Sequence, residues 1–297
     1  MAVTTSSAPL TAPAAASKHR SEWQNAWRRF SANRVALVGL AMLTIIILMA
    51  VFAPVIAPYD PINDMDTAMR GCPPSSAHWF GCDHLGRDLL SRVIFGARIA
   101  LIAGIGATII SVTIGVIVGA LAGFLGGWTD AILSRIVDTL MSFPIIALLI
   151  VLAAVLGPSL VTTVVVIGVT VWSRYARVVR ADVMSLRERD FIVAAYASGV
   201  RSWRIIWRHL VPNVMGPVIV LASLGIGSII ILEAALSFLG LGVRPPTPSW
   251  GAILADGRAY ILRYPHISFF PGVMIVLTVL AFNFVGDGLR DALDPKE

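Results

Sequence analysis

The side chains with the most obvious chemistry lie together in one polar stretch between apolar runs: Cys72, His78, Cys82 and His84. Of these, His78, Cys82 and His84 are close enough in sequence to be potential metal ligands. The two thiols could instead form a disulfide, because oxidising compartments permit one. The prolines at 73–74 favour a turning chain that would bring the thiols together. We expect a disulfide between Cys72 and Cys82, with two free thiols as the alternative.

The sequence contains no motif for nucleotide binding or covalent catalysis. A P-loop needs Gly-x4-Gly-Lys-Ser/Thr, whose backbone amides and lysine surround the phosphates. The only lysines are Lys18 and Lys296, and neither stands in that context. No His-Glu-x-x-His, paired aspartate or Ser–His arrangement occurs in the apolar runs. The chain is therefore not expected to be an enzyme.

The composition indicates a membrane protein. Hydrophobic residues make up 57% of the chain and charged residues 13%, with a mean hydropathy of +0.82. A soluble domain carries roughly a quarter charged residues, and a spanning helix needs about 20 apolar residues. We expect an all-α integral membrane protein with six transmembrane helices. The predicted spans are 35–56, 99–125, 140–156, 160–183, 214–241 and 267–285.

Outside the spans, the chain divides into an arm and loops. Residues 1–30 are expected to be a disordered cytoplasmic arm, since their start is rich in Ala, Ser, Thr and Pro. Residues 31–297 would form the transmembrane domain. The first span would be retained because it begins only after Arg34, lacks an evident small-residue cleavage site and is long enough to span. Most of the 23 Lys and Arg residues fall on the side of the arm and of loop 173–213. The positive-inside rule therefore places both termini in the cytoplasm.

The net charge of +6 is explained by this topology and by attraction to anionic lipid headgroups. The sequence has no basic patch interleaved with aromatic residues, the pattern that would suggest nucleic-acid binding.

The cytoplasmic loop at about 184–213 reads as two short helices separated at Gly199. Small residues at 194–198 would let another backbone approach closely. In the second helix Trp203, Ile206, Trp207 and Leu210 recur on one helical face. The loop fits either a docking surface for a soluble partner or an interfacial helix at the lipid headgroups. The residue types alone favour neither.

This loop resembles the EAA loop of the permease subunits of ABC importers. That pattern reads Glu-Ala-Ala, three residues, Gly, nine residues and Ile-x-Leu-Pro. The matching positions are Ala194, Ala195, Gly199 and Pro212. Val193 replaces the glutamate and removes one charged contact. Segments 78–101 and 231–251 and the C-terminal residues 283–295 are similar to the dipeptide and oligopeptide permease branch, so the resemblance covers nearly everything after residue 25.

The resemblance implies a type I ABC importer permease fold, in which the loop inserts a coupling helix into a groove of an ATPase subunit. The residues expected to dock are Ala194, Ala195, Tyr196, Gly199 and Arg201. The implied partners are a homologous second permease, two ATPase subunits that bind ATP and Mg, and an extracytoplasmic peptide-binding protein. The location would be the bacterial plasma membrane.

The cargo implied is di- or oligopeptides, with nickel, glutathione or another small solute as alternatives. An ATP-independent carrier is the rival from a different class. It would lack an ATPase partner, and the docking loop argues against it. The family pattern around His78 and His84 implies no metal, so no metal site is expected. The family also has a threonine-like residue at the position of Cys82.

Charged and glycine residues in the spans give no definite substrate path. Glu233 is expected to lie near the outer end of span five and to bond to backbone or to an outer-loop arginine. Asp138 is expected at the interface near Arg135. Gly225 and Gly227 fit pore lining or helix packing equally well.

Overall fold

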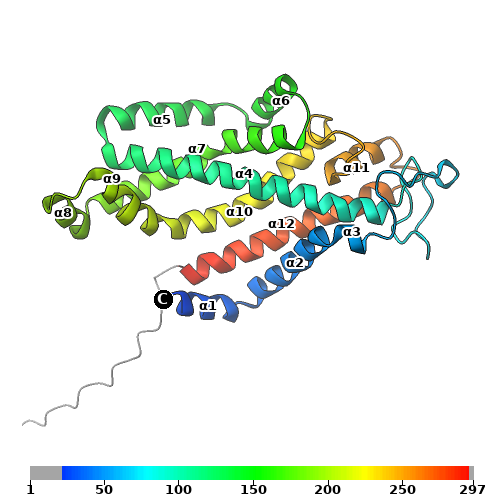
Figure 1. Cartoon of the computed structure of the whole chain (residues 1–297), viewed down its shortest axis with the longest axis horizontal. Helices are drawn as coiled ribbons and strands as arrows, with labels where there is room; N and C mark the ends of the chain where they lie inside the picture. Colours follow the sequence, from blue (N-terminus) through cyan, green and yellow to red (C-terminus); the bar gives the residue numbers. More distant parts are fainter. Residues whose placement is uncertain (1–21, 294–297) are drawn as a thin grey trace, which may run out of the picture.

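The computed structural model describes residues 22–293, and apart from one β-bridge between Cys82 and Asp88 its regular elements are helices (Figure 1). The helices are α1 (Glu22–Ala32), α2 (Arg34–Val51), α3 (Ala53–Ile56), η1 (Thr67–Met69), α4 (Leu89–Leu125), α5 (Gly127–Ser142), α6 (Ile145–Leu156), α7 (Leu160–Arg187), α8 (Asp190–Ala197), α9 (Ser202–Ile205), the π-helical turn η2 (Ile206–Leu210), α10 (Val211–Phe238), α11 (Trp250–Arg258) and α12 (His266–Leu293).

Four helical stretches of the described chain are long and apolar enough to cross a membrane. They are α2, α4, the continuous stretch Ser202–Phe238 that ends in α10, and α12. They contain most of the first, second, fifth and sixth predicted spans. The fourth predicted span lies in α7, whose 28 residues include several arginines and which is not among the four. The charge of α7, rather than its length, separates it from the others.

The third predicted span, 140–156, is not one continuous helix in the structure. Helix α5 ends at Ser142 and α6 begins at Ile145, and the two are bent by 91° at this break. Pro144 has no N–H to continue the helix, and it restricts the preceding residue to extended backbone. Phe143 accordingly has φ −84° and ψ 140°. Counting this bent pair as one span brings the total to five.

The predicted boundary of the disordered arm at residue 30 is also wrong. Residues 1–21 lie outside the described part of the chain, and α1 begins at Glu22. Phe30 of α1 is buried with Ala36 of α2 and Ala292 of α12. The Asn33 side chain accepts hydrogen bonds from the N–H groups of residues 35 and 36, which caps α2. Helix α1 is therefore part of the packed domain.

Glycines bring α4 and α7 into backbone contact. A Cβ at Gly115 would lie 2.5 Å from the Cβ of Tyr175, and one at Gly119 would lie 2.6 Å from the carbonyl oxygen of Ala176. Gly123 makes the same kind of approach to α7. Small residues at this spacing allow close helix packing in membranes. We infer that α4 and α7 move as one body.

The functional loops lie at opposite ends of the molecule. Figure 1 shows α8 and α9 at one end, and the loop before α4 together with α11 at the other. Helix α1 and the end of α12 lie toward the α8 end. The long helices α4, α7 and α10 connect the two ends.

Candidate functional site

Helix α8 ends in a glycine-dependent cap. The N–H of Gly199 donates to the carbonyl of Tyr196 at 3.0 Å, and the N–H of Val200 donates to the carbonyl of Ala195 at 3.2 Å. This pair of bonds is the Schellman motif, which needs left-handed backbone at its penultimate residue. Gly199 has φ +74°. The cap turns the chain sharply into α9.

The inner face of the loop is fixed to the membrane helices. Ile192 of α8 is 2% exposed, and Ile205, Ile206 and Leu210 are buried with it in one apolar cluster. Helices α4, α7 and α10 supply the other side of that cluster, including Phe124. Burial of a large aliphatic side chain contributes about 1.5–3 kcal/mol. Movement of this loop must therefore move the ends of three long helices.

The outer face of the loop is free in this chain. Ala194, Tyr196, Gly199 and Arg201 are exposed, and Tyr196 is 65% exposed. Ala195 differs, since it is half-buried and packs on the apolar cluster. Four of the five predicted docking residues are thus accessible to a partner, and the fifth helps to anchor α8.

The second half of the loop does not form one simple apolar face. Ile206 and Leu210 are buried, whereas Trp203 is 63% exposed and packs edge-on against Trp207 with 5.3 Å between ring centroids. The π-helical turn η2 inserts an extra residue per turn and shifts the register. The regular period predicted from the sequence is therefore broken here.

Two ion pairs join α5 to α7. Arg180 donates to Asp130 through Nη2 at 2.7 Å, and Arg177 donates to Asp138 at 2.6 Å. Asp138 is expected near Arg135, and the structure gives it an ion pair with Arg177, which α7 places opposite α5. Helix α5 is thereby attached to the α4–α7 pair.

A hollow of about 490 Å³ lies where the α5–α6 break meets α7 and α10. Its wall is mostly apolar, but it includes the polar residues Thr170, Ser173, Arg174, Tyr175 and Ser228. None of these five polar residues is predicted from the sequence to line a site. The available signal was an arginine within a long helix whose neighbours carry hydroxyls.

The two glycines of span five have different neighbours. A Cβ at Gly225 would collide with the Tyr175 hydroxyl, and Gly225 lines the hollow. A Cβ at Gly227 would lie 3.3 Å from Val279 of α12. Gly225 thus makes room beside the hollow, and Gly227 serves helix packing.

Glu233 is fully buried near the α11 end of α10, and it is hydrogen-bonded to a hydroxyl rather than to the expected backbone group or outer-loop arginine. Its Oε1 accepts from the Ser237 hydroxyl at 2.7 Å, and the Ser249 side chain contributes a second hydrogen bond to the carboxyl group. Nearby, Gly251 packs on the carbonyl of Ala234, so α11 lies directly against α10. The carboxyl therefore lies in the contact between these two helices.

The loop before α4 is closed by a disulfide between Cys72 and Cys82. Asp88 is 3.0 Å from Nδ1 of His78 and accepts from Ser91 at 2.7 Å. No group of three or more His, Cys, Asp and Glu is placed to bind a metal within residues 22–293. His78 thus takes part in a hydrogen-bonded turn.

Buried ion pairs continue this loop toward α11. Asp83 accepts from Nε of Arg87 at 2.7 Å and lies 3.3 Å from Nη1 of Arg92. Asp256 of α11 lies 3.5 Å from Nη2 of Arg92. Buried arginines need such partners to offset desolvation. The loop and α11 therefore form one continuous cap at the end of the molecule opposite α8, which we call the outer cap.

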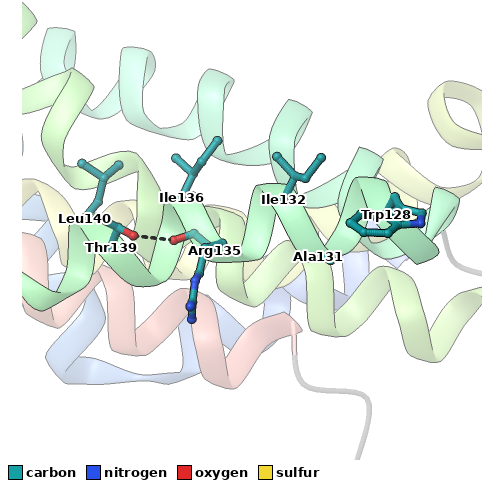
Figure 2. Close-up of a pocket in the computed structure, with 7 residues that line it drawn as sticks. All are labelled: Trp128, Ala131, Ile132, Arg135, Ile136, Thr139 and Leu140. Atoms are coloured by element: carbon teal, nitrogen blue, oxygen red, sulfur yellow. Dashed lines mark hydrogen bonds between the residues drawn. The ribbon is translucent and has the colours of Figure 1, made fainter.

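A shallow apolar hollow runs along the outer side of α5 (Figure 2). Ile132 and Ile136 point to the same side of the helix, and Arg135 points away from them. Trp128 at one end is 86% exposed. This face offers mainly apolar contact.

Family comparisons agree with this architecture. A model described as "binding-protein-dependent transport system inner membrane component" matches residues 111–297, and one for the N-terminal transmembrane domain of oligopeptide transport permease C matches residues 21–74.

Curated relatives cover nearly the whole chain. The dipeptide transport system permease protein DppC of Alkalihalophilus pseudofirmus is 44% identical over 278 residues, which are 93% of this chain and 90% of that protein. The glutathione transport system permease protein GsiD is 44% identical in Escherichia coli and 46% in Shigella flexneri, in each case over 277 residues, 93% of this chain and 91% of the relative.

Proposed function

Because the chain belongs to the family of inner membrane components of binding-protein-dependent transport systems, we propose that it forms half of the pore of an ATP-driven importer of di- or oligopeptides. It carries no nucleotide motif, and ATP hydrolysis falls to separate ATPase subunits, which bind ATP and Mg. A homologous second permease completes the pore, and an extracytoplasmic binding protein delivers the cargo.

The observation that carries the coupling role is the two-sided character of α8. Its inner residue Ile192 is buried among the ends of α4, α7 and α10, while Ala194 and Tyr196 point outward. A partner that binds the exposed face of α8 can therefore displace the long helices rather than a flexible loop. Nucleotide-driven closure of the ATPases would rotate these packed helices as rigid bodies.

The topology of the proposal places α8 and both termini in the cytoplasm of a bacterial cell. The arginines of α7 and of loop 184–213 support this side, by the positive-inside rule. The outer cap and α11 then face the compartment that permits the disulfide between Cys72 and Cys82. The binding protein would dock on this cap.

Peptide cargo is supported by the similarity to a dipeptide permease. Glutathione, a small peptide with two carboxylates, is the second candidate because the GsiD relatives are equally similar. Both cargoes share the peptide bond and a free carboxylate. Uptake of labelled trialanine and labelled glutathione by the assembled transporter decides between them.

The docking proposal is tested by co-purification of the ATPase subunits with the chain and its second permease. Ala194→Trp places a large ring on the exposed face of α8 and removes no internal contact. Loss of one well-packed contact region typically costs more than about 1.4 kcal/mol of binding free energy. The amount of ATPase that co-purifies with the chain should therefore fall about tenfold. Ala131→Trp, at an exposed alanine of α5, should retain the wild-type amount.

Uncoupling is measured by assaying both ATP hydrolysis and cargo uptake in the same samples. Ala194→Trp should reduce cargo-stimulated hydrolysis and uptake together. If Ala194→Trp binds the ATPases and transports like the wild type, α8 is not the docking helix, and an interfacial lipid-bound role takes its place.

A further inference from the structure

Arg174 occupies an unusual position in the middle of α7. The helix runs from Leu160 to Arg187, so Arg174 lies about 21 Å along it at roughly 1.5 Å per residue. Its side chain is exposed and lines the hollow between the α5–α6 break and α10. A charged side chain at such depth is costly in lipid and is by default a functional candidate.

Neighbouring arginines on α7 already have partners. Arg177 pairs with Asp138, and Arg180 pairs with Asp130. Arg174, one turn nearer the membrane centre, has no ion-pair partner among residues 22–293. The acids of α5 thus neutralise the arginines nearer the cytoplasmic end and leave Arg174 available.

The walls of the hollow indicate water rather than lipid around this cation. Thr170, Ser173 and Ser228 contribute hydroxyls to a lining that is otherwise apolar. The break at Pro144 bends α6 away from the line of α5 and leaves the hollow open beside α7. Ionisable groups within membrane proteins face such water-filled spaces.

We propose that Arg174 lines the translocation path and binds the free carboxylate of the cargo as it passes. This inference rests on the proposed peptide cargo, whose C-terminal carboxylate is independent of peptide sequence. A guanidinium presents a planar fork of donors that matches a carboxylate in two parallel hydrogen bonds. A single such group in a hydrated hollow gives a weak, transient site, as passage requires.

The test compares cargo with and without that carboxylate. The transporter is assembled with its second permease, ATPases and binding protein in proteoliposomes, and the binding protein is saturated with each cargo. The probes are trialanine, trialanine amide and glutathione. With wild-type protein, free-acid uptake should exceed amide uptake. Arg174→Gln should reduce free-acid uptake about tenfold, the value of one charge-assisted contact, and leave amide uptake nearly unchanged.

Two variants separate recognition from structure. Arg174→Lys keeps a cation and should retain most of the preference for the free acid. Arg177→Gln removes an arginine that is already paired and should leave the preference at the wild-type ratio. Basal ATP hydrolysis of the Arg177→Gln protein should equal that of the wild type, because Arg177 lies outside both α8 and the proposed cargo contact.

The outcomes are distinct. If Arg174→Gln lowers acid and amide uptake equally, Arg174 supports structure or pairs with the second permease, and the inference is wrong. If Arg174→Gln transports both at wild-type rates, Arg174 is not in the path. If wild-type protein imports neither trialanine nor glutathione, the proposed cargo class fails, and this inference fails with it.

Discussion

At the scale of single residues, position along the backbone decides what a small side chain does. Gly199 and Gly119 are both glycines in functional elements, yet the first is required for its conformation and the second for its size. At Gly199 φ is +74°, and a Cβ would meet no atom of the described chain within 4 Å. At Gly119 a Cβ would lie 2.6 Å from a backbone carbonyl.

Gly199→Ala should therefore lower stability through backbone strain. Left-handed conformation costs a residue with a Cβ about 1–2 kcal/mol, and the Schellman cap of α8 should weaken. Gly216→Ala is the matched control, since that glycine is helical and also has open space around it in the described structure. There alanine should be neutral or stabilising by about 0.5–1 kcal/mol. Thermal unfolding of the purified proteins measures both, and equal midpoints would contradict the assigned role of Gly199.

The residues expected to dock lie in one segment, but the structure does not place all of them on one exposed face. The spacing of Ala194, Ala195 and Gly199 identifies the loop, because it is a local pattern. Which alanine points inward depends on the packing of Ile192 among three distant helices, and no local pattern carries that information. The ion pair of Asp138 could not be predicted for the same reason, since Arg177 comes from a separate helix.

At the scale of elements, the long apolar runs of the sequence predict where helices lie but not where a helix is interrupted. Helices α2, α4, α10 and α12 follow from hydropathy alone. The bend at Pro144 was missed because the apolar run continues across it. Helices α1 and α11 were missed because each is short and only partly apolar. The hollow beside Arg174 could not be foreseen without that bend.

We expect the packed contact between α4 and α7 to transmit the motion of loop 184–213. Gly119→Leu would force these backbones apart and should destabilise the protein by about 1–3 kcal/mol, as overpacking does. Gly272→Leu on α12, where the described residues leave open space for a Cβ, should change stability little. Thermal unfolding and cargo-stimulated ATP hydrolysis give the two readouts. A Gly119→Leu protein with wild-type stability and coupling would show that α4 and α7 need not move together.

At the scale of the whole molecule, the chain connects two surfaces at opposite ends. The outer cap is tied together by a disulfide and buried ion pairs, and the inner loop is anchored in an apolar cluster. The long helices between them carry the proposed path, with the hollow beside α7 at mid-length. Such an arrangement suits alternating access, in which movement at the ATPase end opens one side and closes the other.

The most direct measurement is site-specific cross-linking from α8 in membranes that contain the assembled transporter. Both native cysteines lie in the disulfide, so Tyr196→Cys adds a single reactive thiol for a maleimide photo-cross-linker. We predict an adduct between Tyr196→Cys and the ATPase subunit, and none from Leu262→Cys, which is 99% exposed beyond α11. Lipid adducts from Tyr196→Cys without an ATPase adduct would contradict the docking role of α8.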